Sequence, residues 1–223
     1  MAPAALNPRL ASADAAPPAL WDPLVRISHW GIAAVVITNG LFTRGGSTTH
    51  VWIGWLGMAL LLMRLVWGVI GRPEARFSAF PPNPAAAVRH LADLLTARPR
   101  DYASHNPAGA IMVYALWASL AVVIATGLVM TGGASPMKLA EQEAALNSAD
   151  WSTLAPEGGE AETGGDDRSS WLKEVHSVAA NMMLVLAVLH VAGVAVESRA
   201  TRRNLVAPMI AGSRAPSGSG RGA

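Results

Sequence analysis

The sequence contains no cysteine among its 223 residues. This absence excludes disulfides, iron–sulfur clusters held by thiolates, cysteine-based zinc sites and the C-x-x-C-H attachment of c-type haem. Charged residues are also scarce, since they make up 14% of the chain where a soluble domain has about 25%. Because 52% of the residues are hydrophobic, the composition indicates an integral membrane protein.

Both ends of the chain differ from its middle. Residues 1–20 are rich in alanine and proline and have no continuous apolar core, so we interpret them as a disordered tail and not as a cleaved signal peptide. Residues 211–223 are rich in glycine and serine and are predicted to be a second disordered tail. The membrane domain is therefore expected to span residues 21–210.

Four stretches of this domain approach the roughly 20 apolar residues that a membrane-spanning helix needs. They cover residues 24–43, 50–70, 108–130 and 172–196. The predicted fold class is therefore all-α, an integral membrane four-helix bundle. Between the second and third stretches, Asn83-Pro84 is typical of a helix start, and apolar residues recur at helical spacing from Val88. This connection is either a short amphipathic helix on the membrane surface or an ordinary solvated connector.

Charge predicts the orientation of the four helices. Residues 71–106 contain five arginines against three acids, and five more arginines follow Glu197. Residues 131–170 contain eight acids against one lysine and one arginine. By the positive-inside rule, both termini are cytoplasmic and the acidic loop 131–170 lies outside the membrane. That loop is either a docking surface for a basic partner or merely solvated.

The fourth stretch carries two of the six histidines, His176 and His190. Fourteen residues of helix rise about 21 Å and return to within about 40° of the same face, so one helix holds both rings in line. The predicted orientation places His29 at the inner level of His190, and His50 at the outer level of His176. No cofactor role is assigned to the two histidines of the connecting segment, His90 and His105.

Two levels, each with two histidines from different helices, match the axial ligands of two six-coordinate haems. A single membrane histidine is equally well explained as a hydrogen-bonded core residue, but two matched pairs are much harder to explain in this way. A proton or metal-ion transporter is the different-class alternative. It would normally have acidic residues within the membrane, and none lies in the apolar part of these stretches, because Glu174 stands before the apolar run of the fourth. The third stretch supplies no ligand, so its predicted role is packing.

Two arginines are candidates for contact with the inner haem. Arg64 lies fourteen residues after His50, and therefore on nearly the same face at the inner level. A buried arginine needs an anion, and a haem propionate is one candidate partner. Arg26 lies one turn before His29 and is a second candidate. For both arginines the alternative is extension of the side chain to the cytoplasmic headgroups, which is favoured for Arg26.

The sequence resembles the bacterial cytochrome b561 family, and is similar to the cytochrome b subunit of nickel–iron hydrogenases. The resemblance covers about residues 21–210. It is carried by WDPLVRISHW, HVWIGWLGMALLLMRLVWGVIG, HNPAGAIMV and WLKEVHSVAANMMLVLAVLHVAGV, which begin at positions 21, 50, 105 and 171. It implies two non-covalent b haems, with ligands that fall on His29, His50, His176 and His190.

The resemblance also implies a function: electron transfer between the outer face of the bacterial inner membrane and the quinone pool. Three donors or acceptors are compatible with the outer end: a periplasmic c-type cytochrome, a dehydrogenase or hydrogenase subunit, or superoxide. Superoxide would make the chain an enzyme, but the eight acids of the outer loop oppose an anionic substrate. A partner protein is therefore the first expectation. No nucleic-acid partner is expected.

Overall fold

The computed structural model describes residues 22–96, 106–148 and 165–212. In these ranges all regular secondary structure is helical. Four helices are long and apolar enough to cross a membrane: α1 (Pro23–Leu41), α2 (Thr48–Ile70), α4 (Pro107–Met130) and α6 (Gly165–Ala200). The predicted all-α fold with four membrane-spanning segments is thus confirmed. The predicted tails, His105 and the centre of the acidic loop lie outside the described residues.

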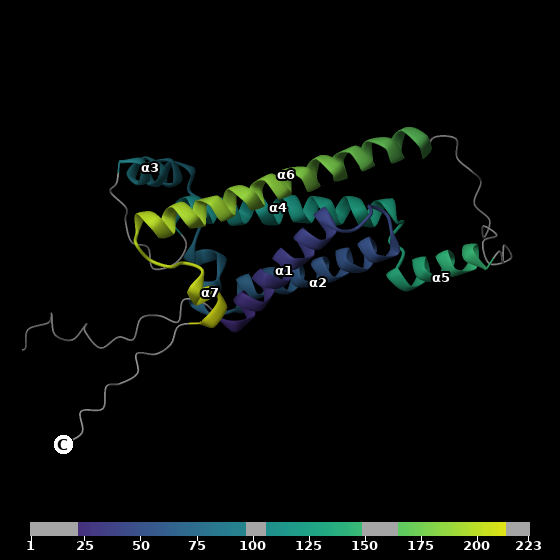
Figure 1. Cartoon of the computed structure of the whole chain (residues 1–223), viewed down its shortest axis with the longest axis horizontal. Helices are drawn as coiled ribbons and strands as arrows, with labels where there is room; N and C mark the ends of the chain where they lie inside the picture. The colour runs from purple at the N-terminus through teal and green to yellow at the C-terminus, as the bar shows by residue number, and fades with distance from the viewer. Residues whose placement is uncertain (1–21, 97–105, 149–164, 213–223) are drawn as a thin grey trace, which may run out of the picture.

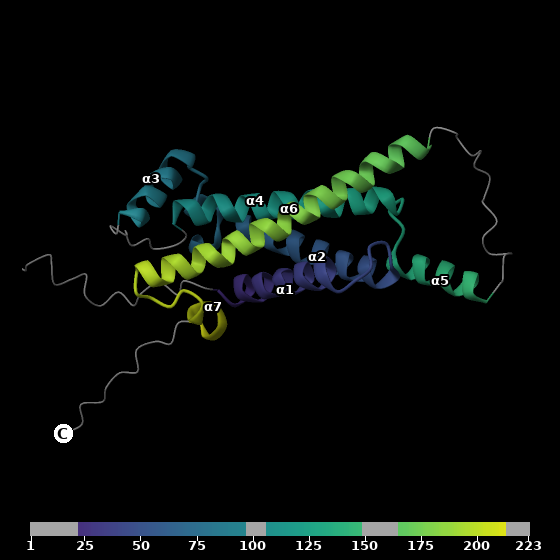
Figure 2. The ribbon, with the colours of Figure 1, turned by 45° about the horizontal axis from the view of Figure 1, so that its top comes forward.

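The four long helices form two pairs. Helix α1 packs mainly on α2, and α4 packs mainly on α6; each pair lies side by side in both views (Figures 1 and 2). The start of α1, helix α3 (Pro84–Leu95) and helix α7 (Ala207–Ala211) lie at one end of the bundle. Helix α5 (Pro136–Asn147) and the start of α6 lie at the other end. Residues far apart in sequence therefore meet at each end.

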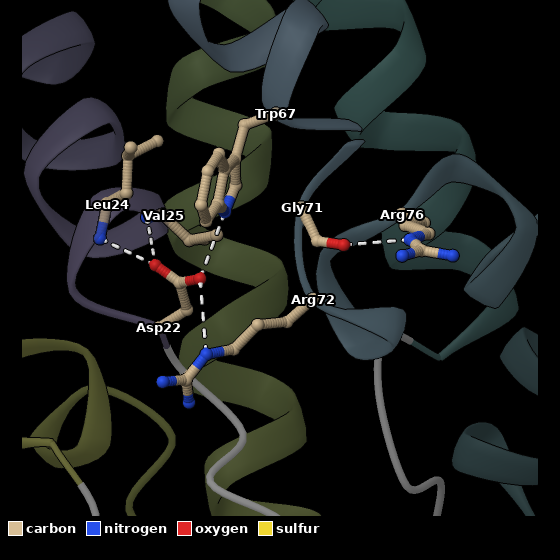
Figure 3. Close-up of polar contacts among 7 residues, drawn as sticks. All are labelled: Asp22, Leu24, Val25, Trp67, Gly71, Arg72 and Arg76. Carbon is tan, nitrogen blue, oxygen red and sulfur yellow. Dashed lines mark hydrogen bonds and ion pairs between the residues drawn. The ribbon is translucent and has the colours of Figure 1, made fainter. Parts of the chain in front are cut away.

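Asp22 links the start of α1 to the end of α2 (Figure 3). Its Oδ1 accepts hydrogen bonds from the backbone N–H groups of Leu24 and Val25, at 2.7 and 3.4 Å. Its Oδ2 accepts one from Trp67 Nε1 at 2.9 Å and lies 3.9 Å from Arg72 Nε. The carboxylate thus satisfies N–H groups that the first turn of a helix leaves without partners. At the same time it ties the start of α1 to the last turn of α2.

A layer of four apolar side chains, one from each long helix, lies at the centre of the bundle. They are Val36, Leu61, Leu120 and Met183. Met183 is midway between His176 and His190 along α6, so this layer lies between the two histidine levels. Lipid tails are as apolar as these residues, so close packing rather than removal from water is what holds helices together in a bilayer.

Small residues bring the helices into close contact. A Cβ on Gly57 of α2 would lie 2.9 Å from Val35 Cγ1, and one on Gly40 of α1 would lie 3.0 Å from Leu184 Cδ2. The tightest contact is at Gly68 in α2, where a Cβ would lie 2.3 Å from Cζ of Phe77. Phe77 belongs to a short 3₁₀ segment, Phe77–Ala79, that follows α2. The ring of Phe77 therefore leaves no room for a side chain at position 68.

Replacement of Gly68 by alanine is expected to lower the free energy of unfolding by about 1–3 kcal/mol through overpacking. This cost exceeds the gain of up to about 1 kcal/mol in helix propensity. Gly193 in α6 is a matched control, because a Cβ added to it would have nothing within 4 Å. Unfolding midpoints in detergent should therefore fall for Gly68→Ala and stay level or rise for Gly193→Ala. Equal midpoints for the two variants would contradict this packing.

The connection between α2 and α4 contains the predicted helix, α3, whose start is capped by Asn83 through a 2.9 Å bond from Ala86 N–H. Its buried face carries Ala87 and His90, whereas Val88 and Leu91 are 67% and 51% exposed. The apolar side predicted from the helical spacing therefore faces away from the bundle. This is the arrangement expected of a helix whose apolar face meets the membrane interface.

The acidic loop contains more helix than the sequence predicts. Helix α5 occupies Pro136–Asn147, and Ser135 caps it by accepting a 3.3 Å bond from Lys138 N–H. Helix α6 begins at Gly165 and has 36 residues, which corresponds to about 54 Å. Since the hydrocarbon core of a bilayer is about 30 Å thick, α6 extends beyond it.

Candidate metal centres

The four membrane histidines meet in two pairs. The rings of His29 in α1 and His190 in α6 have centroids 6.2 Å apart, and the rings of His50 in α2 and His176 in α6 are also 6.2 Å apart. These are the pairs that the sequence analysis matched by depth. Each pair joins the α1–α2 half of the bundle to α6, and all four rings are only partly buried.

The spacing within each pair suits one metal ion between two imidazoles. A coordinating imidazole nitrogen lies about 2.0–2.1 Å from a first-row metal ion, and the ring centre lies about 1.1 Å farther away. Two rings on opposite sides of one ion would then have centres about 6.3 Å apart. The observed 6.2 Å in both pairs agrees with this value.

The number of ligands favours haem over a metal held by side chains alone. The described parts of the chain contain no group of three or more His, Cys, Asp or Glu residues that could hold a metal ion. Zinc sites need at least three such ligands. Haem iron brings its own equatorial nitrogens and needs only two axial side chains. The two pairs therefore fit two bis-histidine haems.

Threonine hydroxyls contact the outer pair, His50 and His176. His50 Nδ1 lies 3.0 Å from Thr43 Oγ1, and His176 Nδ1 lies 2.9 Å from Thr126 Oγ1. With Nδ1 engaged in this way, Nε2 is the nitrogen left to coordinate a metal. Thr126 lies in α4, so this helix contributes a hydrogen bond to the site. The sequence alone predicts only a packing role for α4.

The backbone of His50 is held by residues at the end of α1 and just before α2. Ser47 Oγ accepts a 3.2 Å bond from the backbone N–H of His50, as the N-cap of α2. Asn39 Nδ2 donates to the backbone carbonyl of His50 at 3.0 Å. Gly46, with φ at 77°, allows the tight turn before Ser47. The position of His50 is therefore supported by the end of α1 and by the turn before α2.

The inner pair has different surroundings. His29 Nδ1 is buried and has no hydrogen-bond partner among the described residues. The edge of Trp30 packs against the His29 ring, with centroids 5.2 Å apart. A buried ring nitrogen without a partner is unusual, and His29 lacks the hydrogen bond that each ring of the other pair has at Nδ1.

Comparison with known families decides the class of protein. Residues 20–212 match the family described as prokaryotic cytochrome b561. The chain belongs to the prokaryotic cytochrome b561 family. It is accordingly a multi-pass membrane protein of a family that transfers electrons by b-type haem. Comparison with curated proteins and with solved structures gives no significant match.

Arg64 of this cytochrome is buried, with 5% exposure. Its Nη2 donates to the carbonyl of Ala75 at 3.2 Å, and its guanidinium lies 5.0 Å from the centre of the Trp117 ring. Its Nη1 is buried without a hydrogen-bond partner in the part of the chain that the structure describes. Arg64 thus stays within the bundle, with one donor available for an anion. Its contact with a haem propionate remains a prediction.

Arg26 is engaged elsewhere. Its Nε donates to the carbonyl of Met209 at 3.1 Å, and its Nη2 donates to the carbonyl of Ile210. Trp30 Nε1 donates to the same Met209 carbonyl at 3.1 Å. Arg26 therefore fixes α7 against the start of α1. The propionate role of Arg26 stays a prediction, and these contacts give it no support.

A buried pair at the same end escaped the sequence analysis. His90 Nε2 of α3 lies 3.1 Å from Glu197 Oε2 of α6, and the two residues are 1% and 7% exposed. His90 joins the connecting helix to the end of α6. A single histidine in an amphipathic segment gives no sign of its partner 107 residues away.

Gly127 provides a test of the outer site. A Cβ there would lie 3.5 Å from Cε1 of His176, so a leucine would push its branched end into the ring. Gly127→Leu is therefore expected to lower the occupancy of the outer haem at least tenfold, an effect of the size seen when metal ligands are misplaced. Gly193→Leu is the control, and it should keep full haem content by absorbance. Unchanged haem content in Gly127→Leu would contradict the placement of His176.

Proposed function

We propose that this cytochrome b561 carries single electrons across the bacterial inner membrane through two b haems. His29 and His190 hold the inner haem, and His50 and His176 hold the outer one. The observation that carries the proposal is that one helix, α6, presents two histidines, each 6.2 Å from a histidine of another helix. When bound, each haem supplies iron that takes up and releases one electron.

The protein's own residues make the path specific for electrons. Two histidines from different helices would hold each haem, and they would leave no position on the iron for an oxygen molecule or a substrate. Between the two levels lies the apolar layer formed by Val36, Leu61, Leu120 and Met183. The levels are about 21 Å apart along α6.

The orientation follows from the charges at the two ends. Arg72, Arg76 and Arg199 lie at the end that carries α3 and α7, and Glu141 and Glu143 lie in α5 at the other end. By the positive-inside rule the arginine-rich end is cytoplasmic, so both termini are cytoplasmic. The acidic outer end repels an anion such as superoxide. It favours a basic redox protein, such as a periplasmic c-type cytochrome or dehydrogenase subunit, with membrane quinone at the other end of the path.

Electron transfer across a sealed membrane tests this function. The purified cytochrome would be placed in liposomes that enclose ferricyanide, and a membrane-impermeant reductant would be added outside. We expect ferricyanide to be reduced in liposomes with the wild-type protein. Reduction should fall to the rate of protein-free liposomes in His176→Ala, which interrupts the path at the outer level. A wild-type protein that binds both haems but gives only the protein-free rate would overturn the proposal.

A further inference from the structure

The two histidine pairs differ in what their second ring nitrogen contacts. Both outer histidines have a threonine hydroxyl at Nδ1, Thr43 for His50 and Thr126 for His176. At the inner level, the structure gives His29 Nδ1 no partner among the residues it describes. The four helices thus build one pair in which both rings have a hydroxyl at Nδ1 and one pair in which His29 has none.

Each threonine has a second contact that sets the direction of its hydrogen bond. Thr43 Oγ1 donates to the carbonyl of Asn39 at 3.0 Å, and Thr126 Oγ1 donates to the carbonyl of Val122 at 2.8 Å. A hydroxyl has one proton to donate. This arrangement favours a proton on Nδ1 that is donated to the hydroxyl oxygen, and it leaves the lone pair of Nε2 for a metal.

We propose that Thr43 and Thr126 are positioning residues that fix this tautomer and make the outer haem the lower-potential haem of the two. The inference rests on the proposed two-haem function. A hydrogen bond from Nδ1–H to an oxygen raises the basicity of the imidazole. A more basic ligand stabilises ferric over ferrous iron, and so lowers the reduction potential. The hydroxyl is a better acceptor because it donates to a carbonyl in turn.

Charges at the two ends of the bundle also make the reduction potential of the outer haem lower than that of the inner haem. Arg64 is buried at the inner level. A nearby positive charge stabilises the ferrous, reduced state of a haem and so raises its reduction potential. At the outer end, Thr48 donates a hydrogen bond to the carboxylate of Glu143, and a negative charge disfavours that state. An electron that arrives at the outer haem therefore moves to the inner haem with a fall in free energy. Flow runs from the outer face towards the cytoplasmic face.

The test is a potentiometric titration of the haem absorbance in full-length Thr43→Val and Thr126→Val. It is made in the wild-type background and also in His190→Ala, where only the outer haem remains. Loss of one hydrogen bond should change the ferric-to-ferrous ratio of the outer haem about three- to tenfold. Tenfold corresponds to a rise of about 59 mV for one electron. The potential of the inner haem should stay unchanged.

Thr131→Val is the matched control, because Thr131 also donates to a carbonyl one turn earlier in α4, that of Gly127, at 3.2 Å. No hydrogen bond joins it to a histidine among the described residues, and its replacement should shift neither potential. An outer potential that does not move in Thr43→Val or Thr126→Val, with haem retained, overturns the inference but leaves the two-haem function intact. A wild-type protein without haem overturns the function instead.

If the valine variants lose the outer haem, their outer potential is not measurable. The serine variants Thr43→Ser and Thr126→Ser, which keep the hydroxyl, then provide the test. Restoration of haem and of the wild-type potential by serine supports the proposal. If serine fails as valine does, the hydroxyl is not what the site uses, and the proposal is wrong.

Discussion

Replacement of His190 by alanine is expected to remove the inner haem and leave the outer haem in place. The same change at His176 should do the reverse. The reason is that each ring faces a different partner, His29 or His50, at 6.2 Å, so each variant deletes one of the two axial ligands of a single site. Haem content should fall to about half in each variant. Loss of a hydrogen-bond partner of a metal ligand lowers metal affinity about 10- to 100-fold, and loss of the ligand itself should lower that affinity further. Absorbance of the reduced protein, divided by protein concentration, measures it.

Asn181 supplies the control for these two variants. It lies in α6 between the two histidines, and its side chain is exposed, so Asn181→Ala changes the same helix without touching either pair. It should keep full haem content. The double variant His176→Ala/His190→Ala should bind no haem at either level. If His190→Ala kept both haems, or lost both while staying folded by circular dichroism, the assignment of ligands to levels would be wrong.

Replacement of Arg64 by methionine is expected to weaken the inner haem and spare the outer one. Methionine keeps much of the apolar volume and removes the charge. A charge-assisted hydrogen bond contributes about 1.5–3 kcal/mol, so the dissociation constant of the inner haem should rise roughly 10- to 150-fold if Nη1 holds a propionate. The inner potential should also fall, because a nearby positive charge is lost. Haem titration of the apoprotein and a redox titration measure the two effects.

Arg76 is the matched control for Arg64. It lies at the same end of the bundle, where its Nε donates to the carbonyl of Gly71 at 2.8 Å (Figure 3). Arg76→Met therefore removes a cation with one carbonyl contact but leaves the buried donor of Arg64 in place. Equal haem affinity in the two variants would show that Arg64 serves the fold through Ala75 and Trp117 and holds no propionate.

The membrane helices and the histidine pairs could be predicted because both depend on local or periodic properties. Long apolar runs predict spanning helices, and the fourteen-residue spacing on α6 predicts two sites on one face. Alternating loop charge then gives each helix a direction, which is enough to match His29 with His190 and His50 with His176 by depth. The structure brings the same pairs together.

Contacts that join distant polar residues could not be predicted in this way. Asp22 with Trp67, Thr126 with His176, and His90 with Glu197 each depend on the rotation of one helix against another. Sequence periodicity sets which residues share a face of one helix, but not which neighbour that face meets. Thr126 did carry a weak signal, because it is one of few polar residues in an otherwise apolar helix.

Helix α5 was missed for a different reason. The acidic loop was interpreted through its charge and its glycine pairs, although Ser135-Pro136 and the helix-forming residues that follow it are typical of a helix start. Its composition is that of a solvated helix, which has no apolar stripe to reveal it. Local capping chemistry was therefore the better guide in this segment.

The most direct test of the account is the haem content of the purified protein. The dithionite-reduced minus oxidised spectrum should show the α-band of a b-type, low-spin, bis-histidine haem, and the ratio of haem to protein should be close to two. A ratio close to one would contradict the paired-site account, and a spectrum without a b-type α-band would contradict the assignment of all four histidines.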